Sequence, residues 1–110
     1  MTSRIAPKKN GFKDFVMDQL SDLRGVTARA MFGGYGLYRR DAFFGIIHKS
    51  RLYFKTSDET RATFIRHGMR PFRPNGKQTL KTYYEVPADI IEDAEQLTEW
   101  AQRSASLRKS

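Results

Sequence analysis

The chain contains no cysteine and no long apolar run, and both absences narrow what it can be. Without cysteine it can form neither a disulfide framework nor a thiolate metal site. No stretch approaches the roughly 18 apolar residues that cross a bilayer, and residues 1–9 lack the apolar segment of a signal peptide. We therefore expect a cytoplasmic protein that makes no membrane contact.

Groups that commonly carry out catalysis are also scarce. The two histidines, His48 and His67, stand apart from any carboxylate at the spacing of a metal-binding motif. No nucleophile with a general base and a general acid can be assembled from the remaining residues. The sequence thus predicts no catalytic residue, no metal and no cofactor, and an enzyme is the least favoured class.

What the chain does have is enough apolar material for one small domain. Its 110 residues are 39% hydrophobic and 13% aromatic, which predicts a globular protein with a modest core. We expect a basic, loosely ordered N-terminus over residues 1–9, a domain over 10–105 and a loosely ordered end over 106–110. No internal repeat or low-complexity tract is present.

The net charge of +8 is distributed unevenly along the chain. No carboxylate occurs between Thr60 and Tyr84, whereas acidic residues are concentrated between 85 and 99. This pattern predicts a bipolar surface. The basic segment could bind phosphate backbones or an acidic protein face, or it could be a solvated surface partly neutralised by the chain's own acidic helix. Its basic residues are Arg61, Arg66, Arg70, Arg73, Lys77 and Lys81.

Hydrophobic periodicity predicts a helix followed by short strands. The helix covers residues 11–24, with Asn10 as its N-cap and Gly25 at its end. Four β-prone segments follow and are separated by turn signals, which favours an antiparallel meander. These segments are residues 26–32, 35–39, 42–48 and 51–55.

The second half of the chain predicts two more helices and one more strand. Residues 58–67 form a helix that ends before Gly68 and turns Ala62, Phe64 and Ile65 toward the sheet. Segment 69–81 is an irregular loop or a wide hairpin, and residues 79–86 could add a fifth strand. A closing helix spans residues 90–105, with Asp93 and Gln96 as a capping-box variant.

These elements give the order α-β-β-β-β-α-β-α. The predicted fold is α+β, with a single antiparallel sheet of four to five strands and helices packed on it.

Three glycines among aromatic residues mark an unusual backbone path. Gly33 and Gly34 between two β-prone segments indicate a tight turn or bulge, and Gly36 indicates a second bulge or a close approach of chains. A phosphate-binding loop is not favoured, because no Gly-Lys-Ser/Thr follows and the next segment is a strand.

The run from Arg29 to Tyr38, Arg-Ala-Met-Phe-Gly-Gly-Tyr-Gly-Leu-Tyr, resembles the signature of the TfoX N-terminal domain family. The resemblance covers roughly residues 10–105 and implies a small α+β domain. Family members with a second, C-terminal domain regulate competence genes together with the cyclic-AMP receptor protein, whereas we expect this chain to be a stand-alone N-terminal-type domain. Further matching positions are Phe43-Phe44, residues 51–56, residues 83–87, Asp93, Leu97, Trp100 and Ala101.

Two functions from different classes follow. The first, implied by the resemblance, is a non-catalytic regulatory or protein-interaction module whose partner belongs to the transcription machinery. The alternative is weakly specific nucleic-acid binding through a basic surface. The sequence also allows a two-fold homodimer that forms through an edge strand. The candidate interaction residues are Arg29, Tyr35, Tyr38, Arg70, Arg73, Lys77 and Lys81, and Gly33, Gly34 and Gly36 are candidate structural positions.

The aromatic residues have two interpretations. Tyr38 and Phe43 belong to a group of rings that could stack on bases, and Phe72 and Tyr83 are mixed with cations further along the chain. Alternation along a strand places Tyr38 on one face and Tyr35 on the other, so about half of the rings should belong to the core.

Overall fold

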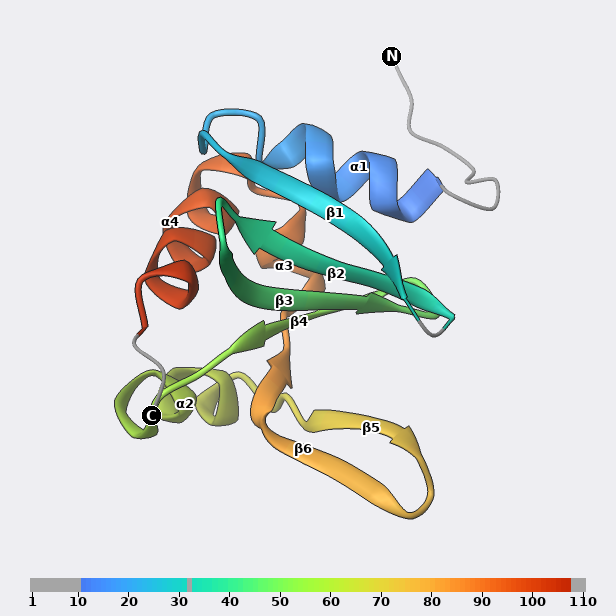
Figure 1. Cartoon of the computed structure of the whole chain (residues 1–110). Coiled ribbons are helices and arrows are strands. Elements are labelled where there is room, and N and C mark those ends of the chain that lie inside the picture. Colours follow the sequence, from blue (N-terminus) through green and yellow to red (C-terminus); the bar gives the residue numbers. More distant parts are fainter. Residues whose placement is uncertain (1–10, 32, 108–110) are drawn as a thin grey trace.

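A computed structural model describes residues 11–31 and 33–107, and it confirms the α+β class (Figure 1). Six antiparallel strands form one sheet in the order β1-β2-β3-β4-β6-β5, so the sheet is larger than the four to five strands expected. The elements are α1 (Gly11–Gln19), β1 (Val26–Met31), β2 (Gly34–Arg39), β3 (Ala42–His48), β4 (Arg51–Lys55), α2 (Asp58–Arg66), β5 (Pro71–Asn75), β6 (Gln78–Glu85), α3 (Ala88–Ile91) and α4 (Ala94–Ala105).

The expected meander of the first four strands is present, and the extra strand comes from the second half of the chain. β1 to β4 pair in chain order through short turns. Of the two alternatives for segment 69–81, the structure shows a hairpin: the segment contains β5, the turn and the first half of β6, and Asn75 pairs with Gln78 across a two-residue turn. β6 then pairs with β4, placing Tyr84 opposite Phe54.

The first helix is shorter than its periodicity predicts. α1 ends at Gln19, and Leu20 and Leu23 reach the core from successive turns, with Leu23 N–H donating to the Leu20 carbonyl at 2.9 Å. Gly25, with φ +84°, therefore does not end the helix; its carbonyl accepts from Arg40 N–H at 2.8 Å at the start of β1. The predicted N-cap Asn10 lies outside the described residues.

The closing helix is two helices instead of one. Asp93 has an extended backbone (φ −109°, ψ 98°) and caps α4, its carboxylate accepting from Gln96 N–H at 3.1 Å. An N-cap residue is non-helical, so the same capping that starts α4 separates it from α3. α2 matches its prediction, with Gly68 in the left-handed region, but only Phe64 of its predicted inward residues is buried. Ala62 is exposed, and Ile65 is 55% exposed.

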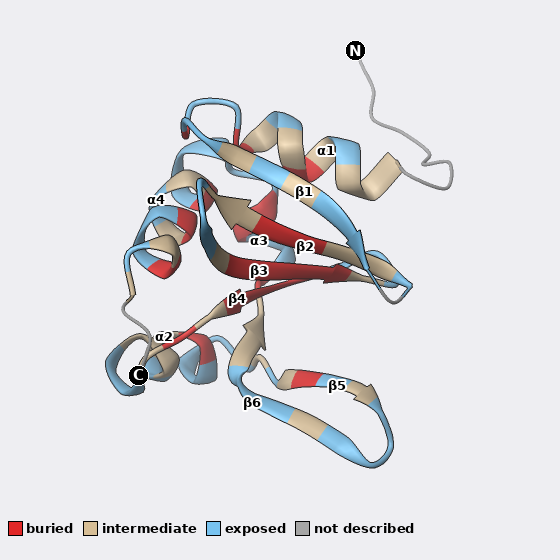
Figure 2. Cartoon of the chain, in the orientation of Figure 1, coloured by how far each residue is buried: buried red, intermediate tan, exposed pale blue. Residues whose placement is uncertain are grey.

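The main core lies between the sheet and the helices on one of its faces. Figure 2 shows the buried residues along the central strands β2, β3 and β4. Phe44 and Phe54 are fully enclosed there, and truncating either ring to alanine should cost about 3–5 kcal/mol. The cluster joins each described helix to the sheet through Val16, Phe64, Ile90, Ile91, Leu97 and Ala101.

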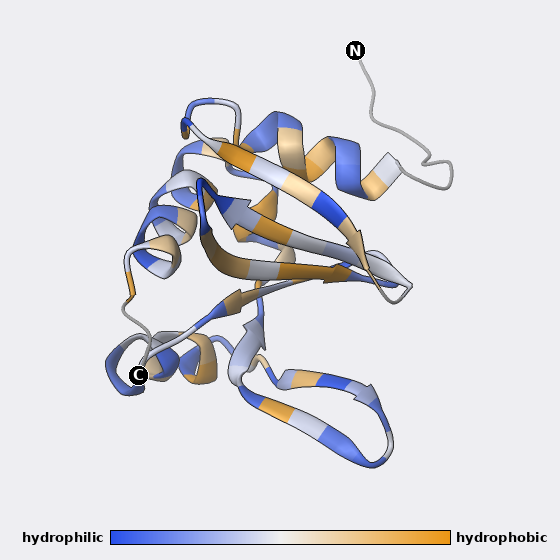
Figure 3. Cartoon of the chain, viewed as in Figure 1, coloured by the Kyte–Doolittle hydropathy of each residue, from blue (hydrophilic) through white to orange (hydrophobic). Residues whose placement is uncertain are grey.

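A second, smaller cluster lies on the opposite, outer face of the sheet. It consists of Ile46, Tyr53 and Phe72, with Phe43 and Tyr83 packed against it. Phe72 belongs to β5, so this cluster attaches the β5–β6 hairpin to the sheet. Figure 3 shows most of that hairpin as hydrophilic beyond the attachment point.

Candidate functional site

A row of rings crosses the outer face of the sheet and ends at a cation. The Arg29 guanidinium lies 4.7 Å from the centre of the Tyr38 ring, Tyr38 lies 5.1 Å from Phe43, and Phe43 lies 5.6 Å from Tyr83. We call these four residues the outer-face cluster. They come from β1, β2, β3 and β6, so the surface exists only once the sheet has formed.

The glycine run makes this cluster sterically possible. Gly36 pairs with Arg29, and a Cβ atom at Gly36 would lie 2.8 Å from Met31 Sδ and 3.0 Å from Phe43 Cε1. The close approach expected at Gly36 is therefore confirmed, and the sheet irregularity falls one step later, between Leu37 and Tyr38.

The other two glycines divide between turn and strand. Gly33 has φ +70° and occupies the turn between β1 and β2. Gly34 is not part of that turn: it pairs with Met31 as the first residue of β2, and a Cβ atom there would overlap the Ile47 carbonyl oxygen.

Tyr35 does not join the other candidate residues of β2. Its ring packs against the main core on the helix side, and the Lys13 ammonium lies 5.3 Å from the ring centre. Strand alternation explains the separation, because Tyr35 and Tyr38 are an odd number of residues apart. Of these three candidate residues, the structure therefore places Arg29 and Tyr38 together on the outer face and Tyr35 on the opposite face.

The remaining candidate cations form a second group on the β5–β6 hairpin. Arg70, Arg73, Lys77 and Lys81 are all exposed. The ion pairs among the described residues are Lys13–Asp14, Arg51–Glu85 and Arg61–Asp58, so none of the four hairpin cations has a carboxylate partner. Arg73 donates a long hydrogen bond of 3.4 Å to the Gly76 carbonyl.

Charge separates between the sheet and the helices. Glu85 is the single acid in the six strands as the structure describes them, and both of its carboxylate oxygens accept from Arg51, at 3.0 and 3.2 Å. The described helices instead carry acids, including Asp14, Asp58 and Glu95 in their first turns. The sheet therefore presents a positive surface whose basic residues are Arg29, Arg39, Arg51, Lys55, Arg73 and Lys81.

Burial raises the pKa of two tyrosines on the outer face, Tyr53 and Tyr83. It raises the pKa of Tyr83 to about 12, with a smaller contribution from nearby Tyr38. Burial also raises the pKa of Tyr53, aided by Glu85 and opposed by Arg51. At neutral pH the Tyr53 and Tyr83 hydroxyls are therefore uncharged.

Other potential sites offer less. Among residues 11–31 and 33–107, no group of three or more His, Asp or Glu side chains could hold a metal ion. No described helix is long and apolar enough to cross a membrane. A small hollow lies between α2 and α4. The hollow is lined by Thr60, Thr63, Phe64, Trp100, Arg103 and Ser104.

Sequence reasoning missed Phe43 and Tyr83 as members of one site. It treated them as parts of two separate aromatic groups, since 40 positions separate them in the chain. The β4–β6 pairing unites them. One local signal was available. Tyr83 and Glu85 are two positions apart in a strand, so Tyr83 lies on the same face of the sheet as a charged residue.

The structure defines a small α+β domain with helices on one face of a basic, six-stranded antiparallel sheet. The sequence model of the TfoX N-terminal domain family matches residues 18–107, and the chain belongs to this family. It is 31% identical to the DNA transformation protein TfoX1 of Aliivibrio fischeri (strain ATCC 700601 / ES114). That alignment covers 74% of this chain and 44% of the relative, so the chain spans less than half of the relative's length.

Proposed function

We propose that this domain is a non-catalytic, cytoplasmic regulatory module that acts on DNA transformation by binding another protein. Its family and the name of its relative, a DNA transformation protein, support the process. The open edge of the sheet at β1 supports the mode of action, and it is the observation on which the proposal mainly rests.

The two edges of the sheet differ in their capacity to accept another strand. The β5 edge contains Pro71 and Pro74, which lack the N–H group that a further strand would need. β1 contains no proline, and its residues from Arg29 to Met31 are exposed. Among the described residues, no hydrogen bond reaches β1 from outside the sheet. An extended segment of a partner can therefore add to β1 by main-chain pairing.

Arg29 gives this edge a preference for acidic partners. Its guanidinium is held over Tyr38 beside the edge, and the chain carries a net charge of +8. A strand bearing Asp or Glu opposite Arg29 would gain a cross-strand ion pair, whereas a second copy of β1 would bring like charges together.

Photo-crosslinking in the source organism tests this proposal. A photoreactive amino acid is placed at exposed Thr27 on β1, with exposed Ala62 on α2 as the matched control site. We expect one protein to crosslink from Thr27 and not from Ala62, and Arg29→Glu to lower both the crosslink and the transformation frequency. Equal crosslinking from both sites, or an unchanged transformation frequency after deletion of the gene, would contradict the proposal. A crosslink at twice the chain's mass would identify a second copy as the partner.

A second candidate function is weakly specific nucleic-acid binding. The observation that favours it is the group of four hairpin cations, none of which has a carboxylate partner among the described residues. Clustered cations release counterions from a phosphate backbone, so binding should weaken steeply as salt is raised. Fluorescence anisotropy of a labelled duplex at two salt concentrations measures this directly.

A further inference from the structure

The β5–β6 hairpin is an ordered arm with a polar tip. Asn75 pairs with Gln78 across the turn, and the Asn75 side-chain oxygen accepts from Lys77 N–H at 2.8 Å and Gln78 N–H at 3.0 Å. A side chain that satisfies two turn amides fixes the turn without help from the rest of the molecule. The tip therefore has a defined shape before it meets any ligand.

The base of the arm is anchored firmly to the sheet. Phe72 is 6% exposed and lies 4.6 Å from the Tyr53 ring and 5.3 Å from the His48 ring. On the other strand of the arm, the Thr82 carbonyl accepts from both the backbone N–H and the hydroxyl of Thr56, at 2.7 and 2.9 Å. Figure 1 shows the arm extending from these anchors away from α1, α3 and α4.

The exposed part of the arm is basic and almost free of apolar surface. Arg70 lies at its base, Arg73 and Lys81 on its strands and Lys77 at its tip. No carboxylate occurs between Thr60 and Tyr84, and the next one, Glu85, is already paired with Arg51. Leu80, at 37% exposure, is the exposed large apolar side chain of the arm. Such a surface favours phosphate groups over an apolar protein face.

We propose that the β5–β6 hairpin inserts into the major groove of duplex DNA and that its cations contact the flanking phosphates. The proposal rests on the second candidate function, nucleic-acid binding. The major groove of B-DNA is about 12 Å wide and about 8.5 Å deep and admits a two-stranded ribbon. The four residue-to-residue steps from Phe72 to Gly76 extend about 13 Å at strand geometry, which is enough to reach the groove floor.

The arm's chemistry also predicts low sequence specificity. Asn75 uses its side-chain oxygen within the turn, so it is not free for the paired contact by which asparagine recognises adenine. Contacts to phosphate position a protein without reading sequence. The major groove of A-form RNA is too narrow for side chains to read, so duplex RNA should bind more weakly than duplex DNA.

Fluorescence anisotropy with a labelled duplex DNA tests the arm against the rest of the surface. With four phosphate contacts, affinity should fall about 150-fold between about 50 and about 200 mM salt. Changing Arg73, Lys77 and Lys81 to Gln together should reduce that fall to about 3.5-fold and weaken binding at the lower salt. The matched control changes Arg24, Arg40 and Arg103, exposed cations outside the arm, to Gln and should retain most of the salt dependence.

Two further measurements separate groove insertion from contact with phosphates alone. We expect bound protein to protect guanine N7 atoms, which lie in the major groove, from methylation by dimethyl sulfate. Duplex RNA of the same sequence should bind at least tenfold more weakly. Circular dichroism confirms that both triple variants are folded.

The outcomes distinguish the arm from the function on which it rests. If DNA does not bind at the lower salt, both nucleic-acid binding and insertion of the arm are wrong. If labelled poly-glutamate binds instead, the partner of the arm is an acidic protein. Equal losses of DNA affinity in the two triple variants would support nucleic-acid binding but contradict the arm as its binding surface. Loss in the arm variant without N7 protection, or with equal RNA binding, would overturn insertion.

Discussion

At the scale of single residues, Tyr83 couples the outer-face cluster to alkaline pH. Its pKa is raised to about 12 in the folded chain, while an unfolded tyrosine keeps its ordinary value of about 10. The neutral hydroxyl therefore contributes stability that is complete below pH 10 and is lost as pH rises through 12. We expect urea unfolding to show this loss between about pH 10 and about pH 12.

Tyr83→Phe isolates that effect. It removes the titrating group and keeps the ring 5.6 Å from Phe43. The variant should lose less stability than the native chain over the same pH interval. Parallel pH profiles for the two proteins would show that Tyr83 titrates normally.

Gly34 should be the least replaceable of the three glycines in the motif. A Cβ atom there would overlap the Ile47 carbonyl oxygen, which belongs to the sheet and cannot rotate away. Gly34→Ala should therefore cost about 1–3 kcal/mol, measured by urea unfolding. Gly76→Ala is the control, because a Cβ atom at Gly76 meets nothing within 4 Å. Equal stability of the two variants would contradict the prediction.

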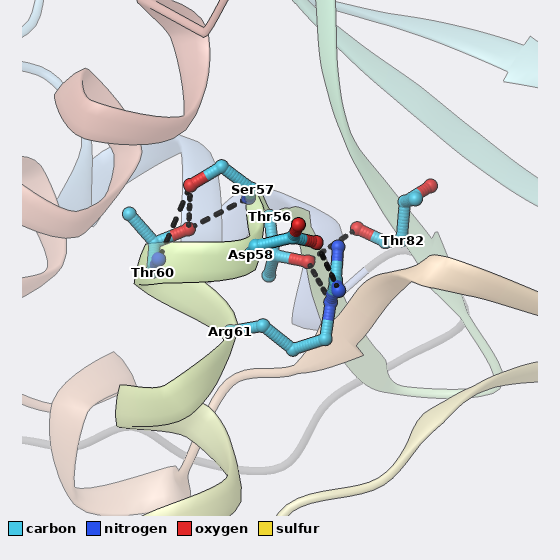
Figure 4. A network of polar contacts seen from close by, with 6 residues as sticks. All are labelled: Thr56, Ser57, Asp58, Thr60, Arg61 and Thr82. Carbon is cyan, nitrogen blue, oxygen red and sulfur yellow. Dashed lines mark hydrogen bonds and ion pairs between the residues drawn. The ribbon is translucent and has the colours of Figure 1, made fainter. Parts of the chain in front are cut away.

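At the scale of elements, α2 is held to β6 through a shared hydroxyl. Figure 4 shows Thr56 between Arg61 of α2 and Thr82 of β6: its hydroxyl donates to the Thr82 carbonyl at 2.9 Å and accepts from Arg61 Nε at 3.0 Å. The Thr56 side chain is buried, and Arg61 is partly buried and also pairs with Asp58. This contact fixes the helix beside the base of the hairpin arm.

Thr56→Val tests that link while preserving the volume of the side chain. It removes the hydroxyl and leaves Arg61 Nε without its acceptor, so it should cost about 1–3 kcal/mol in urea unfolding. Thr56→Ser keeps the hydroxyl and should cost less. Were the serine variant the less stable of the two, the methyl group rather than the hydrogen bonds would hold α2.

The elements also show which parts of the fold the sequence could predict. Strand positions from 26 to 55 were predicted to within a residue or two, because turn signals and alternation are local. The end of α1 at Gln19 was missed because Leu20 and Leu23 continue the helical spacing while belonging to turns. The break at Asp93 was missed for a similar reason, since apolar spacing continues across it.

The larger omission from the sequence prediction was the pairing between distant strands, and this pairing determines which residues form the candidate surface. Nothing local indicates that β6 lies beside β4, so Tyr83 could not be placed next to Phe43 from the sequence. The separation of Tyr35 from Tyr38 was predictable, because it depends only on alternation within one strand. The basic group on the hairpin was predictable as a set of residues, but its position on an anchored arm was not.

At the scale of the whole molecule, the sheet has a net positive charge, whereas the described helices carry more acidic than basic side chains. The single strand acid, Glu85, is paired, while the described helices carry Asp14, Asp58 and Glu95 in their first turns. Acids near helix N-termini stabilise the helix dipole and also offset the excess of positive charge. The carboxylates therefore support stability in two ways, and both are lost when they are protonated.

Acid should consequently destabilise the domain, and salt should restore part of the loss. Protonating the twelve Asp and Glu side chains and the two His takes the formal charge from +8 to +22, and self-repulsion then opposes the compact state. The pKa of Asp93 is lowered chiefly by its hydrogen bonds to Gln96, so its contribution is present above the ordinary carboxyl pKa and is lost as pH falls. We expect added potassium chloride to raise the thermal midpoint at about pH 3 by screening the excess charge, and to change it less at pH 7. A midpoint at acid pH that falls or stays constant with salt would show that loss of the helix N-terminal carboxylates, rather than net repulsion, limits stability.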